Sequence, residues 1–370
     1  MRFVILLLIF AVNVCAQQLP KGMYLESSFL FGQAIKHRST ITMDFPGFSY
    51  GSELNFEMQT YGLKHWHERC GFPRWGIAVS YHHSGNDAQM GSCIAVFPNI
   101  TVDFVRSKNF RLFGRLGLGL GIVTRPFNRQ TNPFNNMVGS YLNNNTSLRL
   151  GVAWRFHRNF ELRPSATFTH FSNAATSLPN LGINILTFQL GLCYMYNPIE
   201  KDNYVILSKE EIVGRNKRIQ FSYVASLGFR DSETNNGPKY PVWHTSLDAG
   251  LFITKSNRIK AGIEYDYIGS SYAFTKHNGG YVGQDLHWQA SRISLFIADE
   301  MMIGRFALLA QIGFYLTQNI GQPWFMSVRL SGRYYFVDPY LNIVAPFVTV
   351  TMKSHKIIAE YFSIGFGMSF

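Results

Sequence analysis

Residues 110–122, FRLFGRLGLGLGI, alternate between two kinds of side chain. Leucine or isoleucine stands at positions 112, 116, 118, 120 and 122, and arginine or glycine at positions 111, 115, 117, 119 and 121. Neighbouring side chains on a β-strand point to opposite faces, so this period of two predicts a strand with one apolar and one polar or small face. We expect the leucines to face lipid and the arginines and glycines to face the lumen of a barrel.

The same alternation recurs along the chain and predicts eight strands on each side of residue 197. The first set lies near 23–36, 49–60, 74–83, 92–106, 110–124, 146–156, 160–172 and 184–196. The second set lies near 217–230, 241–254, 258–269, 286–300, 305–317, 324–336, 340–352 and 359–370. Tight turns such as 107–109 alternate with longer polar loops such as 125–145 and 270–285, which is typical of outer-membrane barrels.

The composition excludes several other classes of protein. Only 15% of the residues are charged, 15% are aromatic and 46% are hydrophobic, which does not fit a disordered chain or a coiled coil. After the N-terminus, apolar runs stay shorter than the roughly 18 residues that a transmembrane helix needs. The net charge is +12, but Lys and Arg are scattered rather than clustered, so we expect anionic lipid head groups and not nucleic acid as the partner.

These observations predict an all-β transmembrane antiparallel β-barrel protein of about sixteen strands. Residues 190–196 resemble residues 364–370, which indicates two tandem eight-stranded repeats. Small inward residues such as Gly117 and Gly367 favour two narrow, filled barrels over the alternative, one sixteen-stranded barrel. The expected domains are a signal peptide at 1–16, a first barrel at 17–197, a linker at 198–216 with a weak helix-capping pattern at Ser208–Glu211, and a second barrel at 217–370.

The N-terminus has the features of an export signal. Arg2 precedes an apolar run at residues 3–12, and Val14-Cys15-Ala16 forms a cleavage site before Gln17. The expected location is therefore the bacterial outer membrane, reached through a cleaved signal peptide. The mature chain keeps three cysteines without framework spacing, which we interpret as packing residues: Cys70, Cys93 and Cys193.

Strand 160–172 carries polar residues on its apolar side. Its even positions, from Leu162 to Phe168, are expected to face lipid, yet His170 and Ser172 continue the same face. Side chains two residues apart on a strand stand about 6.5 to 7 Å apart at their base, so an imidazole can reach a hydroxyl. This is the geometry of a base that activates a nucleophile.

The segment His170-Phe171-Ser172-Asn173-Ala174, followed by Pro179-Asn180-Leu181-Gly182-Ile183-Asn184, resembles the outer-membrane lipid A 3-O-deacylases, also known as acyloxyacyl hydrolases. The resemblance covers residues 145–197 and, more loosely, 20–197. It implies an eight-stranded barrel in which His170 is the general base and Ser172 the nucleophile. Asn173 and nearby backbone N–H groups, with Ala175 where the family usually has glycine, would form the oxyanion hole.

One implied residue departs from the family. The glutamate that orients the histidine is matched here by Asn184. An asparagine can accept a hydrogen bond from the imidazole but cannot stabilise an imidazolium by charge. In a serine-protease triad, replacing the orienting aspartate by asparagine lowers turnover about ten-thousand-fold, largely through the wrong tautomer of the histidine.

The resemblance implies a serine esterase that removes an ester-linked acyl chain from lipid A of lipopolysaccharide in the outer leaflet. No cofactor and no metal are implied, and basic residues such as Arg125 and Arg129 would attract the phosphates. A homodimer is left open. The alternative is a catalytically inactive structural, binding or pore-forming barrel.

Other polar motifs have simpler interpretations. His82-His83 and residues 65–68 lack further ligands at the spacing of a metal site, so we interpret them as loop or interface residues. Residues 143–147, NNNTS, contain glycosylation sequons and are expected in a loop. Ser354-His355 occupies the position of the His170–Ser172 pair in the second repeat, but adjacent residues face opposite sides, which predicts a non-catalytic remnant.

Overall fold

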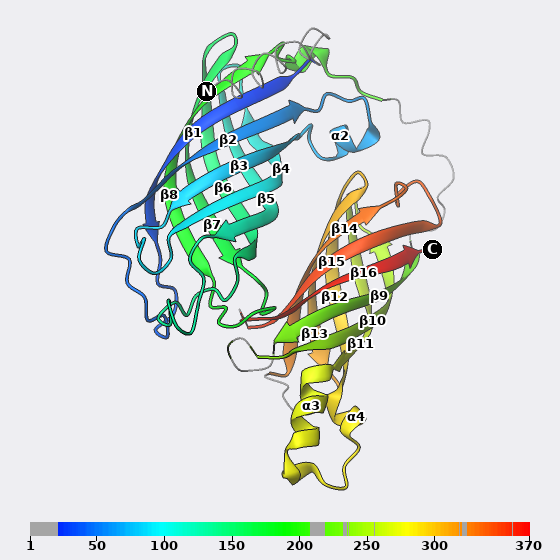
Figure 1. Cartoon of the computed structure of the whole chain (residues 1–370). Helices are drawn as coiled ribbons and strands as arrows, with labels where there is room; N and C mark the ends of the chain where they lie inside the picture. The colour runs from blue at the N-terminus through cyan, green and yellow to red at the C-terminus, as the bar shows by residue number, and fades with distance from the viewer. Residues whose placement is uncertain are drawn as a thin grey trace, which may run out of the picture.

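The computed structural model describes residues 21–207, 219–231, 235, 237–254, 256–317, 319, 324–356 and 358–370. The expected signal peptide at 1–16 and the expected helical turn at Ser208–Glu211 lie outside these residues. Figure 1 shows two closed antiparallel barrels in tandem. The all-β fold and its division into two eight-stranded units are thereby confirmed, and the alternative of one sixteen-stranded barrel is wrong.

Each barrel consists of consecutive strands that pair with their neighbours in sequence. The N-terminal barrel contains β1 (Met23–Ala34), β2 (Ser49–Gln59), β3 (Arg74–His83), β4 (Ser92–Arg106), β5 (Phe110–Val123), β6 (Leu142–His157), β7 (Phe160–Ser172) and β8 (Ile183–Tyr196). The C-terminal barrel contains β9 (Ile219–Asp231), β10 (Lys239–Phe252), β11 (Asn257–Ile268), β12 (Ser291–Ile303), β13 (Phe306–Tyr315), β14 (Met326–Tyr335), β15 (Ala345–His355) and β16 (Ile358–Ser369). The first barrel closes between β8 and β1, and the second between β16 and β9.

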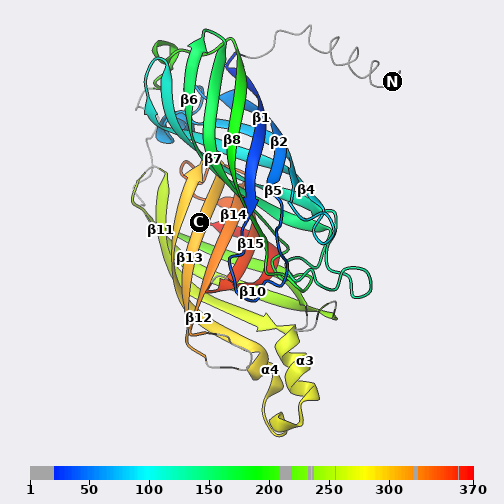
Figure 2. The same ribbon diagram turned by 90° about the vertical axis from the view of Figure 1, so that its left-hand side faces the viewer.

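Several connections contain short helices. The β2–β3 connection contains α2 (His65–Arg69), and η1 (Lys201–Asn203) follows β8. The β11–β12 connection contains α3 (Gly269–His277), η3 (Gly279–Tyr281) and α4 (Leu286–Ala290), which project beyond the barrel end (Figure 2). No helix in the described ranges combines the length and the apolar character that membrane crossing requires.

Three sequence predictions are wrong at the ends of strands. The strand expected at 340–352 begins only at Ala345. The strand expected at 286–300 begins only at Ser291, because the carboxylate of Asp285 accepts hydrogen bonds from the N–H groups of His287 and Trp288 and caps α4 instead. The stretch 143–147, expected in a loop, lies in β6, which begins at Leu142.

The outer wall and the lumen have opposite chemistry, as the alternation predicts. On β5, Leu118 and Leu120 are exposed on the outer wall, whereas Arg115 and Gly117 are buried. Ion pairs fill both lumens: Arg149–Glu26 (2.6 Å), Arg163–Glu57 (2.9 Å) and Arg115–Glu53 (2.7 Å) in the first, and Arg329–Asp266 (2.7 Å), Lys260–Asp248 (2.7 Å) and Arg292–Glu360 (2.6 Å) in the second. An apolar outside and a charged inside suit a wall that faces lipid.

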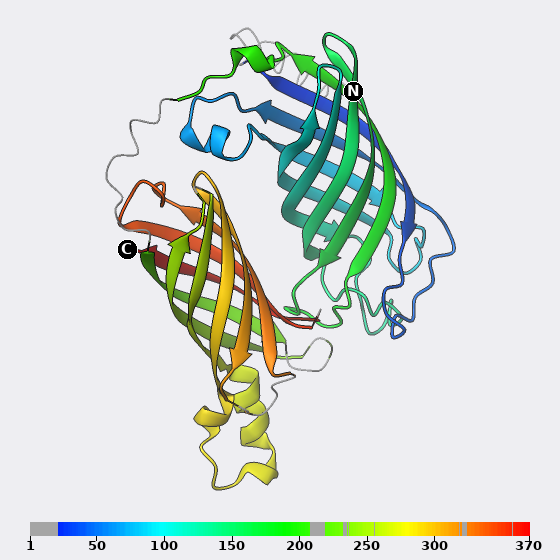
Figure 3. The same cartoon turned by 180° about the vertical axis from the view of Figure 1, so that it is seen from behind.

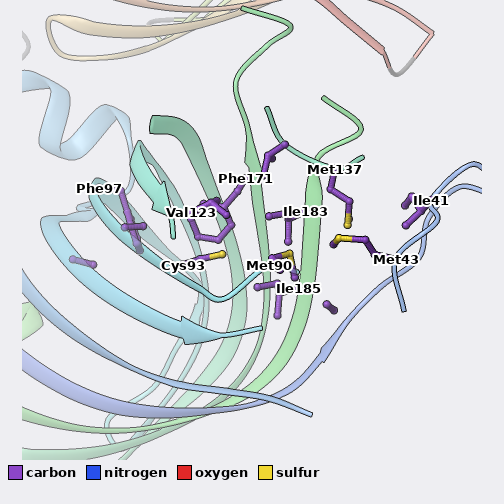
Figure 4. Packing of buried hydrophobic residues seen from close by; sticks show 14 residues of the cluster. Ile41, Met43, Met90, Cys93, Phe97, Val123, Met137, Phe171, Ile183 and Ile185 are labelled. Atoms are coloured by element: carbon purple, nitrogen blue, oxygen red, sulfur yellow. The ribbon is translucent and has the colours of Figure 1, made fainter. Parts of the chain in front are cut away.

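Apolar side chains close one end of the N-terminal lumen. Figure 4 shows Phe171, Val123, Cys93 and Met137 in this buried cluster. Cys93 thus packs as predicted, and Cys70 and Cys193 are also free thiols. We call this end, where loops 124–141 and 173–182 lie, the loop end, and the opposite end the turn end.

The two barrels contact each other at both ends (Figures 1 and 3). At the turn end, Arg69 in α2 forms an ion pair of 3.1 Å with Asp338. At the loop end, the backbone N–H of Leu178 donates to the Asp231 carboxylate at the end of β9 (3.0 Å). The C-terminal barrel therefore touches the loop that follows the His170–Ser172 pair.

Candidate active site

The end of β7 presents His170 and Ser172 on the outer wall. Phe171 between them is fully buried in the apolar cluster of the lumen (Figure 4). Because side chains alternate along the strand, an inward Phe171 directs both neighbours outward. Burial of this large ring therefore fixes the orientation of the candidate pair.

Asn184 lies directly opposite His170 on β8. Its side-chain oxygen Oδ1 is 2.5 Å from the imidazole Nδ1. An oxygen at this position accepts the proton of Nδ1–H, and the neutral ring then carries its lone pair on Nε2. The structure thus brings together the two residues that the sequence analysis assigned as base and orienting group.

Ser172 lies on the same face as His170, but no hydrogen bond joins the two side chains in the described part of the chain. Ser172 is nearly buried, and on the neighbouring strand β6 it lies opposite Asn144. Asn144 in turn donates a hydrogen bond to Thr146, which lies opposite His170 (3.1 Å).

Asn144 and Thr146 extend the polar patch to a third strand. The sequence analysis gave neither residue a role in the site: it interpreted residues 143–147 as loop residues, although its expected strand 146–156 already contained Thr146. With the strand extended to Leu142, the alternation already separates Asn144 and Thr146, on the outer face, from the buried Asn143 and Asn145.

Asn173 organises the loop that follows. Its amide Nδ2 donates to Ser140 Oγ and to the Ser177 carbonyl, each at 2.8 Å, and its backbone N–H donates to Asn180 Oδ1 at 3.0 Å. These N–H groups all have acceptors within the loop region, so Asn173 holds the loop in place.

Ala174 and Ala175 form the centre of a tight turn. Their φ angles are 51° and 61°, and the N–H of Thr176 closes the turn on the Asn173 carbonyl (3.1 Å). Positive φ at both central positions normally selects glycine or asparagine, because the left-handed region costs an alanine about 1–2 kcal/mol. Neither alanine N–H donates a hydrogen bond within the residues that the structure describes. Such strain is found where the surrounding structure holds a functional geometry.

Gly182 and His37 complete the surroundings of the imidazole. Gly182 has φ of +82°, and a Cβ built on it would lie 2.6 Å from His170 Cε1. His37, three residues after β1 ends, has Nε2 3.0 Å from the carbonyl of Leu181. The sequence motif contains Gly182, but the position of His37 follows only from the pairing of β1 with β8.

The other candidate residues lie elsewhere. His82 is buried in the lumen near Phe171, and His83 stacks on Tyr50. The described residues contain no group of three His, Cys, Asp or Glu side chains able to hold a metal ion. His355 points into the second lumen, where Nε2 is 2.7 Å from the Tyr315 hydroxyl.

Two family models match the chain. The model of lipid A 3-O-deacylase (PagL) matches residues 49–193, and the model of the acyloxyacyl hydrolase C-terminal domain matches residues 219–370. The first match contains His170, Ser172 and Asn184. The second covers all strands of the C-terminal barrel. None of the curated proteins compared with the chain matches it.

Three solved structures similar to the chain each cover a little less than half of it. The outer membrane enzyme PagL is 18% identical, with 45% of this chain and 97% of that chain covered and a TM-score of 0.33. Neisserial surface protein A is 12% identical, with 48% and 98% covered and a TM-score of 0.31. The N-terminal barrel of Pseudomonas aeruginosa OprF is 11% identical, with 47% and 98% covered and a TM-score of 0.29.

Proposed function

Since the chain belongs to the family of lipid A 3-O-deacylases and acyloxyacyl hydrolases, we propose that it is an outer-membrane serine esterase acting on lipid A of lipopolysaccharide. The observation that carries the serine mechanism is the 2.5 Å contact between His170 and Asn184, with Ser172 on the same outer face. The reaction is the hydrolysis of an ester that links an acyl chain to the substrate.

In the proposed mechanism, Ser172 Oγ attacks the ester carbonyl and His170 Nε2 takes the hydroxyl proton. The backbone N–H groups of Ala174 and Ala175 are the available donors for the resulting oxyanion. The tetrahedral intermediate then expels the alkoxide, which receives the proton from His170. Water hydrolyses the acyl-enzyme through the same steps and releases a free fatty acid. No metal or cofactor takes part.

The hydrogen bond between Ser172 and His170 would form with bound substrate. In apo enzymes the contact between nucleophile and base is often long, and it tightens in the complex. Asn184 orients the base throughout, because its contact to Nδ1 is independent of the serine.

The location of the site fits a lipid substrate. It lies on the outer wall at the loop end, where the strands below carry exposed apolar residues such as Phe188 and Leu190. A lipid in the outer leaflet would reach Ser172 sideways, with its acyl chains along this wall. Arg125 and Arg129 lie exposed in the adjacent loop 124–141 and would attract the phosphates.

The rival proposal is a catalytically inactive barrel that binds lipid. The neutral amide at position 184 favours it, because the imidazolium formed during catalysis gains no charge stabilisation from Asn184. The pore version of this rival is disfavoured by the ion pairs that fill both lumens.

The test is the release of 3-hydroxy fatty acid from lipopolysaccharide by the full-length protein in detergent. We expect release by the wild type and its loss, by about a thousandfold or more, in Ser172→Ala and His170→Gln. Ser354→Ala, at the corresponding position of the second barrel, is the matched control and should keep full activity. Wild type and Ser172→Ala releasing equally little fatty acid would support the inactive rival.

A further inference from the structure

We infer that Asp231, at the end of β9 in the C-terminal barrel, is a positioning residue for the active site of the N-terminal barrel. The inference rests on the proposed function of Ser172. It makes the C-terminal barrel part of the catalytic unit, although the candidate catalytic residues themselves all lie in the N-terminal barrel.

Asp231 binds the site loop at two points. Its carboxylate Oδ2 accepts a hydrogen bond from the Leu178 backbone N–H at 3.0 Å. Its own N–H donates to the Ala175 carbonyl at 3.3 Å. The two contacts hold the segment 175–178, which begins within the turn at Ala175. Since the Ala175 N–H is a candidate oxyanion donor, Asp231 fixes the loop immediately beside that donor.

The opposite side of the loop is held by the N-terminal barrel itself. Loop 124–141 contributes Ser140 Oγ, which accepts from Asn173, and the Gly139 carbonyl, which accepts from Ser177 Oγ (2.9 Å). It also contributes the Met137 carbonyl, which accepts the N–H of Gly182 (2.9 Å). These contacts hold Asn173, Ser177 and Gly182. The hydrogen bonds at the Ala175 carbonyl and the Leu178 N–H are made by Asp231 instead.

The environment of Asp231 indicates that its position is functional. The residue is 2% exposed, and its second oxygen, Oδ1, has no hydrogen-bond partner among the described residues. A buried carboxylate with one unpaired oxygen destabilises a fold. Two successive alanines at positive φ also destabilise this loop. The Asp231 backbone N–H holds the Ala175 carbonyl in the strained turn, and the costly carboxylate holds Leu178, two residues beyond the end of that turn.

The two ends of the molecule allow a matched comparison. Arg69 joins the barrels at the turn end through its ion pair with Asp338, far along the barrel from Ser172. If Asp231 served only to dock the barrels, weakening either contact would have the same effect. A positioning role predicts an effect at the loop end only.

The experiment measures kcat and KM on lipopolysaccharide for full-length Asp231→Ala, Asp231→Asn and Arg69→Ala. We expect Asp231→Ala to lower kcat at least about tenfold with KM unchanged, because small displacements of catalytic donors act on the transition state. Asp231→Asn keeps an oxygen acceptor for Leu178 and should stay within about threefold of wild type. Arg69→Ala should retain its activity. Amide hydrogen exchange at residues 174–178 should become faster in Asp231→Ala alone.

Wild-type kcat in Asp231→Ala would overturn the inference, and so would an equal loss in Arg69→Ala. A folded wild type that releases no fatty acid would instead refute the proposed function. In that case hydrogen exchange still decides whether Asp231 holds the loop. Unchanged protection of residues 174–178 in Asp231→Ala would show that the Asp231 carboxylate does not hold it.

Discussion

At the scale of single residues, the feature with the largest chemical consequence is the amide of Asn184. The family resemblance implies a carboxylate at this position. The amide oxygen at 2.5 Å from Nδ1 can fix the tautomer of His170. It cannot balance the positive charge that the ring would acquire in the proposed attack by Ser172. Orientation and charge stabilisation, which one carboxylate supplies together, can therefore be separated at this position.

Substitutions of Asn184 should separate these two contributions. Asn184→Asp has the same shape and adds the charge, so we expect a higher kcat. Asn184→Ala removes the acceptor and should lower kcat about a hundredfold, with substrate binding unchanged in both variants. Asn184→Glu adds the same charge with one extra methylene, and its kcat should also exceed that of the wild type. Steady-state deacylation kinetics check the order, and equal activity of Ala and Asn would show that another residue orients His170.

Gly182 should tolerate no side chain. An alanine there would place its Cβ 2.6 Å from His170 Cε1 and would also adopt a strained φ of +82°. We expect Gly182→Ala to lower kcat at least about tenfold by displacing the imidazole. The control is Gly283→Ala, which has a φ of +83° but no atom within 4 Å of the added Cβ. Similar activity losses in both variants would mean that strain alone, and not contact with His170, is responsible.

At the scale of elements, short segments between strands connect the site to the rest of the molecule. The β7–β8 loop carries the candidate oxyanion donors, and α2 carries the contacts to the second barrel at the turn end. Trp66 of α2 packs over Gly304, where a Cβ would lie 2.9 Å from the ring. Neither segment has a hydrophobic period, so their roles depend on the contacts that they make in the folded protein.

The stability of α2 should depend on pH through His67. Burial, assisted by Lys64, lowers the pKa of His67 to about 4 from its usual 6.5. The neutral ring accepts a hydrogen bond from the Gly62 N–H (3.2 Å). Between pH 6.5 and 4 the unfolded segment binds a proton that the folded one excludes, so stability present above pH 6.5 is lost as the pH falls through this window.

Hydrogen-exchange protection factors of residues 62–70 measure this loss. They should decrease between pH 7 and pH 4.5 in the wild type. His67→Gln keeps an acceptor but does not titrate, so its protection should change little. A pH dependence of the same size in both proteins would exclude His67 as the cause.

At the scale of the whole molecule, two filled barrels are joined at their ends by a small number of polar contacts. Each barrel closes its own hydrogen-bonding ladder and has its own network of buried ion pairs. Each therefore has the means to fold alone. The coupling between them is local: Asp231 and the Arg129–Asn235 hydrogen bond lie at one end, and Arg69 and the Cys70–Met302 contact lie at the other.

A chain that ends near Pro198 tests how far the N-terminal barrel suffices. It contains His170, Ser172 and Asn184 and should fold and deacylate lipopolysaccharide. Without Asp231, its kcat should fall to about the value of full-length Asp231→Ala, at least tenfold below wild type. Activity assays on the folded truncated protein check this. Complete inactivity beside an active Asp231→Ala would show that the C-terminal barrel contributes more than this one contact.

The sequence predicted the strands closely because their signal is local. An inward Arg115 directly beside an outward Leu116 identifies the two faces of β5 wherever the strand lies in the fold. The errors occurred at connections, where one residue overrides the pattern. Asp285 caps a helix where a strand was expected. Residues 143–147 are polar on both faces, so they lack the alternation that would have marked the start of β6 at Leu142.

The pairing of His170 with Ser172 followed from their spacing on one strand, and Asn184 followed from a family motif. The sequence by itself thus determined the alternation, the tandem barrels and the candidate pair, because each depends on residues close together along the chain. Only the tertiary structure decided that Asn144, His37 and Asp231 surround the site. They come from β6, the segment after β1, and β9, and only barrel closure and the contact between the barrels bring side chains so distant in sequence into reach of one loop.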